Sequence, residues 1–314
     1  MLWLWVAVIA VLAVMLAAIL TALVCFFLVF YSPARKLPGE DDYPLPRGEI
    51  YEVFREQIVD WVKMVRTLPH ETFSICSYDG LTLRGNYYEY KKGAPVELLF
   101  HGYRGCAERD LCGGVARCFA LGRNALIIDQ RAGGSSEGHV ITFGIREHRD
   151  CLSWVDFAIA HFGNDAKLIL TGISMGAATV MMAAGTDLPK NVVCVLADCG
   201  YTSPSEIIKK VIGDLKLSPT VFYPFIKLGA RLFGRFDLEK TSPLEAMKRC
   251  RVPVIFIHGD TDAFVPFEMS QRLYDVCTAK KAFLAVPGAG HGLAFPVDQT
   301  AYLKALSDFQ TPLL

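Results

Sequence analysis

The 314-residue chain has no excess of charge of either sign, since 32 lysines and arginines balance 32 aspartates and glutamates. This balance excludes the strongly basic surface by which nucleic-acid-binding domains attract phosphates, so we expect no nucleic-acid partner. The sequence also lacks an HExxH zinc motif, and its glycine-rich stretch at residues 133–138 lacks a Walker lysine and the dinucleotide glycine spacing. We therefore expect neither a metal nor a cofactor.

No charged side chain occurs before Arg35, and residues 2–31 are almost all apolar. A helix needs about 20 apolar residues to cross a bilayer, so this run is long enough. A secretory signal peptide is the alternative, because residues 32–34 resemble a small-residue cleavage site. Yet the run exceeds the usual apolar core of about 7–15 residues and lacks a basic N-terminus. We expect an uncleaved transmembrane anchor over residues 1–31.

Cysteine pairs spaced as CxxC and Asn-X-Ser/Thr glycosylation sites are both missing, although ten cysteines are present. Their scatter is not that of a disulfide framework in a small secreted domain. Arg35 and Lys36 follow the apolar run, and positive charge beside a membrane helix prefers the cytoplasm. The globular part is therefore expected on the cytoplasmic side of a cell membrane, although Glu40, Asp41 and Asp42 follow closely.

A linker and an amphipathic helix are expected over residues 32–71, because 32–48 are rich in proline and glycine and 49–67 have helical apolar spacing. From residue 72, short apolar runs alternate with helical patterns. The runs predict strands at 72–78, 81–88, 96–100, 124–129, 167–171, 192–197, 253–257 and 282–286. The alternation predicts an α/β domain over 72–314, with a mostly parallel central sheet and helices on both faces.

The motif most specific for chemistry is Gly172-Ile173-Ser174-Met175-Gly176, between a predicted strand and a predicted helix. A serine on such a tight strand-to-helix turn projects above the sheet, and small residues at 172 and 176 let strand and helix pass closely. The N-terminus of the helix also stabilises developing negative charge. This context predicts that Ser174 is a nucleophile.

A serine hydroxyl needs a base to take its proton, and the base needs an acid to orient it. His291 is the candidate base, because it follows a predicted strand in a glycine-rich loop. Asp262 is the candidate acid, in the loop after the preceding strand. Asp260 and Asp198 compete for this role, although Asp260 suits a tight turn better. We expect Ser174, Asp262 and His291 to form a catalytic triad.

These motifs resemble those of the α/β-hydrolase superfamily over about residues 72–311. The order serine, aspartate, histidine along the chain is that of the superfamily. Segments 258–266 (HGDTDAFVP) and 101–105 (HGYRG) are similar to its acid and oxyanion loops. Segment 129–135 is similar to its D-x-R-G-x-G-x-S stretch, with Ala132 in place of the first glycine. The resemblance implies the α/β-hydrolase fold, with the backbone N–H groups of Tyr103 and Met175 as the oxyanion hole, and is closest to esterase-like and peptidase-like bacterial members.

Residues 201–249 interrupt the alternation, offer no clear strand and carry large apolar side chains such as Phe222, Phe225 and Phe233. We expect a small helical cap here. Solvated phenylalanines would cost free energy, so part of the cap should form an apolar roof above Ser174. The expected partners are then the membrane and a small-molecule ester with an apolar acyl or aryl group.

The motifs together predict a membrane-anchored serine hydrolase that cleaves a carboxylic ester through an acyl-enzyme on Ser174. Thioesterase, amidase or peptidase, and acyltransferase activities use the same triad and stay open. An alternative of another class is a non-catalytic, membrane-tethered binding module that kept the fold, which the intact triad disfavours. Cys106 and Cys112 lie beside the oxyanion loop, so a redox switch there is a further alternative.

Overall fold

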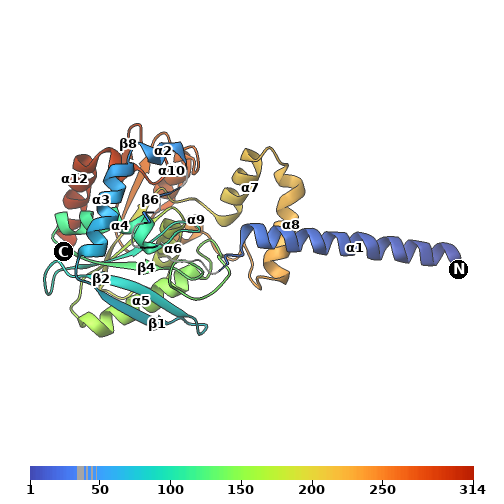
Figure 1. Cartoon of the computed structure of the whole chain (residues 1–314), viewed down its shortest axis with the longest axis horizontal. Helices are drawn as coiled ribbons and strands as arrows, with labels where there is room; N and C mark the ends of the chain where they lie inside the picture. Colours follow the sequence, from blue (N-terminus) through green and yellow to red (C-terminus); the bar gives the residue numbers. More distant parts are fainter. Residues whose placement is uncertain (34–38, 40–41, 44, 47) are drawn as a thin grey trace.

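The computed structural model describes residues 1–33, 39, 42–43, 45–46 and 48–314 (Figure 1). An α/β body lies at one end of the molecule, and a single long helix, α1 (Leu2–Val29), projects from it. Much of the predicted linker at 32–48 lies outside the described residues. Arg35 and Lys36, on which the prediction of membrane orientation depends, also lie outside them.

Within the described residues, eight strands form one sheet in the order β1-β2-β4-β3-β5-β6-β7-β8. Strand β2 is antiparallel to β1 and β4, and the other neighbouring pairs are parallel. The predicted mostly parallel sheet is therefore confirmed. The strands are β1 (Glu71–Cys76), β2 (Thr82–Tyr88), β3 (Val96–Phe100), β4 (Asn124–Asp129), β5 (Leu168–Ile173), β6 (Val192–Asp198), β7 (Val254–Gly259) and β8 (Lys281–Val286).

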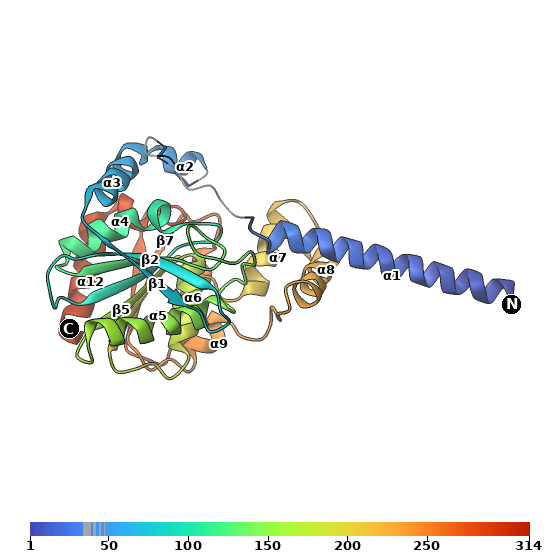
Figure 2. The same ribbon diagram turned by 60° about the horizontal axis from the view of Figure 1, so that its bottom comes forward.

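Helices cover both faces of this sheet, as predicted (Figures 1 and 2). Buried apolar clusters lie between strands and helices on each face, which is why the central strands are mostly apolar. One face is covered by α5 (Glu147–Phe162), α6 (Met175–Ala184), α9 (Pro243–Met247) and α10 (Phe267–Val276). The other is covered by α3 (Arg55–Thr67), α4 (Ala107–Ala120), α11 (Ala294–Val297) and α12 (Gln299–Gln310).

The amphipathic segment 49–67 forms two helices, α2 (Glu49–Glu52) and α3, where one was expected. The apolar face of α3 packs against α4. A Cβ on Gly113 of α4 would lie 2.8 Å from the Trp61 ring, so this glycine makes room for the tryptophan. Trp61 also stacks on Phe295, with ring centroids 5.5 Å apart. The segment therefore covers the α/β body.

The insertion at 201–249 is helical, as expected; its helix α8 (Pro219–Leu232) contacts α1, and α7 (Pro204–Asp214) packs against α8. Helix α7 begins after Ser203, whose hydroxyl accepts a hydrogen bond from the Glu206 N–H. Helix α8 crosses the C-terminal part of α1, where a Cβ on Gly229 would overlap the Ala22 carbonyl oxygen. Among the described residues, α1 is the one helix long and apolar enough to cross a membrane.

Candidate active site

Ser174 lies on the turn between β5 and α6, at the carboxyl end of the central strands. Its backbone has φ 56° and ψ −115°, a conformation that costs a non-glycine residue about 1–3 kcal/mol. Two glycines make the turn sterically feasible, because a Cβ on Gly172 would overlap the Gly176 backbone and one on Gly176 would overlap the Phe100 carbonyl. The strained turn therefore depends on the close passage of β5, β3 and α6.

Replacing Gly172 by alanine is expected to destabilise the protein by about 3 kcal/mol or more, because the added Cβ meets backbone atoms of α6 that have no room to move. Thermal unfolding in detergent would measure the loss. Gly213→Ala in α7 is the matched control, since a Cβ there meets open space and alanine favours the helix by about 1 kcal/mol. Equal stabilities of the two variants would contradict the close passage.

The structure brings the three predicted triad residues together. His291 Nε2 lies 2.9 Å from Ser174 Oγ, and His291 Nδ1 lies 2.7 Å from Asp262 Oδ2. Because an ionised carboxylate only accepts hydrogen bonds, Nδ1 carries the proton and donates to Asp262. The Nε2 lone pair then faces the Ser174 hydroxyl. This tautomer allows the imidazole to take the serine proton.

Asp262 accepts four hydrogen bonds, which keep it ionised. Its Oδ1 accepts from the backbone N–H groups of Phe264 and Val265, at 2.8 and 2.9 Å. Its Oδ2 accepts from His291 and, at 3.1 Å, from Nε2 of the fully buried His258. Burial opposes ionisation, but the hydrogen bonds from His258 and His291 outweigh it and hold the pKa of Asp262 well below its ordinary value.

The two competing aspartates have other partners. Asp260 Oδ1 accepts from the Gly288 N–H at 2.7 Å and so joins the acid loop to the histidine loop. Asp198 Oδ2 accepts from the Tyr302 hydroxyl at 2.8 Å, and burial raises the pKa of Asp198. His291 Nδ1 donates its hydrogen bond to Asp262, so Asp262 and neither of these two aspartates is the partner of the base.

The segment predicted to form the oxyanion hole runs beside the serine. A Cβ on Gly102 would lie 3.6 Å from Ser174 Cβ, so the backbone that leads into Tyr103 passes next to the hydroxyl. Helix α6 begins at Met175, which places that residue's N–H at the positive end of the helix. The Tyr103 hydroxyl donates to the Val29 carbonyl at 2.6 Å, so the same segment also contacts the end of α1.

Hydrogen bonds of the buried His101 hold the segment 101–105 in place. Its Nε2 accepts from the Gln130 N–H at 3.0 Å, so its Nδ1 carries the proton and donates to the Gly102 carbonyl at 2.8 Å. The Gln130 side chain donates in turn to the His101 carbonyl at 2.6 Å. Ala132, two residues after Gln130, has φ 59°, in the left-handed region that favours glycine. The D-x-R-G-x-G-x-S pattern has a glycine at this position.

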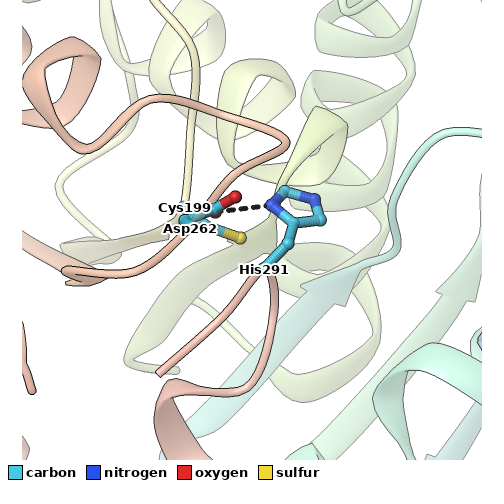
Figure 3. Close-up of side chains that lie close together, drawn as sticks. All are labelled: Cys199, Asp262 and His291. Carbon is cyan, nitrogen blue, oxygen red and sulfur yellow. Dashed lines mark hydrogen bonds and ion pairs between the residues drawn. The ribbon is translucent and has the colours of Figure 1, made fainter. Parts of the chain in front are cut away.

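Three possible metal ligands also meet at the site, as Figure 3 shows for Cys199, Asp262 and His291. One ligand atom from each lies within 4.8 Å of the others. However, His291 Nδ1 and Asp262 Oδ2 are hydrogen-bonded to each other. Burial raises the pKa of the Cys199 thiol well above its usual value, which disfavours the thiolate that a metal would need. The arrangement suits the orientation of His291 by Asp262 better than a metal centre.

The cysteines beside the oxyanion loop have unreactive surroundings. Burial raises the pKa of Cys106 to about 11 and that of Cys112 to about 12. The thiolate is the reactive form of cysteine, so both side chains are protonated at neutral pH. These surroundings disfavour the redox switch that the sequence left open.

A cavity of about 990 Å³ opens in front of Ser174 and His291. Its lining is largely apolar and comes from the sheet edge, α4, α11 and the N-terminal segment. Apolar lining residues include Ile50, Ile58, Trp61, Leu99, Leu111, Phe264, Leu293 and Phe295. Among the described residues, none from 201–249 lines this cavity. The prediction that the cap roofs the serine is therefore wrong, because α8 packs against α1 and the apolar side chains of α7 and α8 join one buried cluster with the end of α1.

The N-terminal segment contributes residues that the sequence reasoning missed. The Tyr51 hydroxyl of α2 donates to the His291 carbonyl at 2.9 Å, across 240 positions of the chain. Apolar spacing in 49–67 indicates a covering helix but does not say which surface it covers. The contact of His258 with Asp262 was not predicted either, and the spacing of four residues between them is the signal that could have indicated it.

Parts of this chain are similar in sequence to known proteins. The model of a family described as alpha/beta hydrolase fold matches residues 98–241. Uncharacterized protein YqkD of Bacillus subtilis is 28% identical over 191 residues, which cover 60% of this chain and 62% of YqkD, so the match spans less than two thirds of that protein. Protein bem46 of Schizosaccharomyces pombe is 27% identical over 226 residues, which cover 70% of this chain and 69% of bem46.

Solved structures share the fold at lower sequence identity. The Pyrococcus furiosus esterase Pf2001 superposes with a TM-score of 0.65 at 19% identity, covering 89% of this chain and 99% of that chain. Est1E from Butyrivibrio proteoclasticus, solved with ferulic acid bound, superposes with a TM-score of 0.60 at 18% identity, covering 77% and 98%. The chain has the α/β-hydrolase fold, and its residues 98–241 match the model of that family.

Proposed function

We propose that this protein is a serine hydrolase that cleaves a carboxylic ester. One observation carries the proposal: His291 lies between Ser174 Oγ, at 2.9 Å, and Asp262 Oδ2, at 2.7 Å. These distances are those of a nucleophile, a base and an orienting acid. The esterases among the structural neighbours have the same fold, which agrees with the proposal but does not assign a substrate.

The proposed reaction begins when Ser174 Oγ attacks the ester carbonyl carbon while His291 Nε2 takes the hydroxyl proton. The tetrahedral oxyanion would accept hydrogen bonds from the N–H groups of Tyr103 and Met175. Collapse breaks the ester C–O bond, and His291 gives its proton to the leaving alcohol. A water molecule then attacks the acyl-enzyme by the same route and releases the carboxylic acid.

A fluorophosphonate probe tests whether Ser174 is activated. The probe reacts with a serine only when a base and an oxyanion hole assist it, so we expect labelling of the folded full chain and none of its Ser174→Ala variant. Denatured protein is the control for non-specific reaction. A folded wild-type protein that takes up no label would favour the non-catalytic binding module.

The cavity suggests an ester with a bulky apolar acyl or aryl group. Each methylene removed from water contributes up to about 0.8 kcal/mol, so kcat/KM should rise up to about fourfold per methylene from acetyl to medium-chain p-nitrophenyl esters. Ile50→Ala should flatten this rise, because Ile50 lines the cavity. The neighbouring Val53→Ala is the matched control, since Val53 is exposed and outside the lining. A flat series for the wild-type protein would reject an apolar acyl site.

The apolar helix α1 supports a further proposal, that the protein is anchored in a cell membrane with the hydrolase body on the cytoplasmic side. The orientation depends on Arg35 and Lys36, which follow the apolar run. Protease added to intact cells is expected to leave the hydrolase body uncut, whereas protease added to lysed cells should digest it. Digestion by protease outside intact cells would show that the body lies on the outer side. A mature N-terminus after residue 31 would show that the apolar helix is a cleaved signal peptide and not an anchor.

A further inference from the structure

Helix α8 carries an apolar stripe on the side that faces away from the hydrolase body. The stripe residues recur at intervals of three and four positions, which places them on one side of a helix. They are Val221, Phe225, Leu228 and Leu232. Val221 and Leu232 are 54% and 50% exposed, and the other two are partly buried. The opposite side of α8 carries Tyr223 and Ala230, which are buried.

Another side of α8, next to the stripe, packs against α1 near the end of its exposed part. Gly229 lies so close to Ala22 that a Cβ there would overlap the Ala22 carbonyl oxygen. Ala22 and Phe26 are buried by this contact, whereas residues 2–21 of α1 are exposed or partly exposed. Twenty residues rising 1.5 Å each span about 30 Å, which is the thickness of the hydrocarbon core of a bilayer. Helix α8 therefore crosses α1 where a spanning α1 would leave the hydrocarbon.

The arrangement of the two insertion helices agrees with this depth. In both views, α8 lies farther from the hydrolase body than α7 does, and it crosses α1 (Figures 1 and 2). A helix that meets a spanning helix at the level where it leaves the hydrocarbon is placed at the membrane surface. Exposed basic residues stand beside both ends of α8, Lys216 before it and Arg235 after it, where lipid phosphates would lie.

We infer that α8 is an interfacial membrane helix, whose apolar stripe is inserted at the boundary between headgroups and acyl chains of the bilayer that α1 crosses. The inference rests on the proposed anchor and goes beyond it, because it assigns the insertion at 201–249 to membrane docking. With α1 and α8 both held by the bilayer, the hydrolase body has two attachments instead of one flexible tether. Tyr103 beside Ser174 contacts the end of α1, so the site is held close to the membrane surface.

Quenching of tryptophan fluorescence by brominated lipids tests the inference on the full chain. The protein is reconstituted in vesicles of equal parts phosphatidylcholine and phosphatidylglycerol, with bromine near the headgroup end of the acyl chains. Val221→Trp and Leu232→Trp each add one tryptophan to the stripe. Tyr90→Trp is the control, since Tyr90 is exposed and follows β2, at the sheet edge opposite the active site. Thermal unfolding in detergent verifies that each variant is folded.

Emission added at 221 and at 232 is expected to fall at least about twofold in brominated vesicles, with almost no change at position 90. Native Trp3 and Trp5 report the insertion of α1 separately in the parent protein. If Trp3 and Trp5 are quenched while the tryptophan at position 221 or 232 behaves like the one at position 90, the anchor stands and the interfacial helix is rejected. The stripe would then be a contact surface for a second copy of this chain or for another protein. If the native tryptophans are not quenched either, both the anchor and the inference fail.

Discussion

Replacing Ser174 by alanine is expected to lower kcat/KM for an ester substrate by about four orders of magnitude or more, with little loss of stability. The Ser174 hydroxyl faces His291 Nε2 at 2.9 Å, so its removal leaves the base with no proton to take from the protein. Alanine keeps the Cβ and accepts the strained backbone as well as serine does. The loss should therefore be one of chemistry and not of folding.

Turnover of a p-nitrophenyl ester and thermal unfolding, measured on the same preparation, separate these two effects. Ser153→Ala on α5 is the matched control, because its hydroxyl donates an exposed hydrogen bond within its own helix, 3.3 Å from the Arg149 carbonyl. Adding His291→Ala to Ser174→Ala should cost almost nothing more, since the members of a triad act as one unit. A folded Ser174→Ala protein with turnover near that of the wild type would end the serine mechanism.

The parts of the fold that could be predicted from sequence are those set by local burial. Strands β3 (Val96–Phe100) and β4 (Asn124–Asp129) have the predicted bounds, because a strand covered on both faces is mostly apolar and so is visible as a short apolar run. The turn at Ser174 was predictable for a similar reason. Gly172 and Gly176 are each placed where any Cβ would overlap backbone, so the two glycines of the motif indicate the tight turn directly in the sequence.

Contacts between distant segments could not be predicted in this way. Helix α3 and helices α7 and α8 are all amphipathic, and amphipathic spacing indicates that a face is covered without indicating by what. The cap was expected over Ser174, yet α3 and α2 cover the cavity, and α8 of the cap packs on α1. The apolar excess of 201–249 is explained by that packing and by the outward stripe on α8, and neither of them lines the cavity in front of Ser174.

Replacing Asp262 by asparagine is expected to lower kcat by about 10⁴-fold, because an amide cannot accept at both ends. Oδ1 of Asp262 accepts from two backbone N–H groups, those of Phe264 and Val265, and Oδ2 accepts from His258 and His291. The amide NH₂ must therefore meet donors at one end. Placed at the Oδ1 end it breaks two backbone hydrogen bonds of the acid loop, and placed at the Oδ2 end it requires His291 to present a lone pair at Nδ1.

The second placement moves the His291 proton to Nε2, where it faces Ser174, and the imidazole then has no lone pair for the serine proton. Asp198→Asn is the matched control. Asp198 Oδ2 accepts from the Tyr302 hydroxyl, which an amide oxygen can accept equally well, so turnover should fall less than about tenfold. Single-turnover kinetics with a p-nitrophenyl ester would compare the two variants, with thermal unfolding measured beside them. A severe loss of turnover in folded Asp198→Asn, together with a mild loss in Asp262→Asn, would show that Asp198, at the end of β6, is the acid instead of Asp262 in the loop after β7.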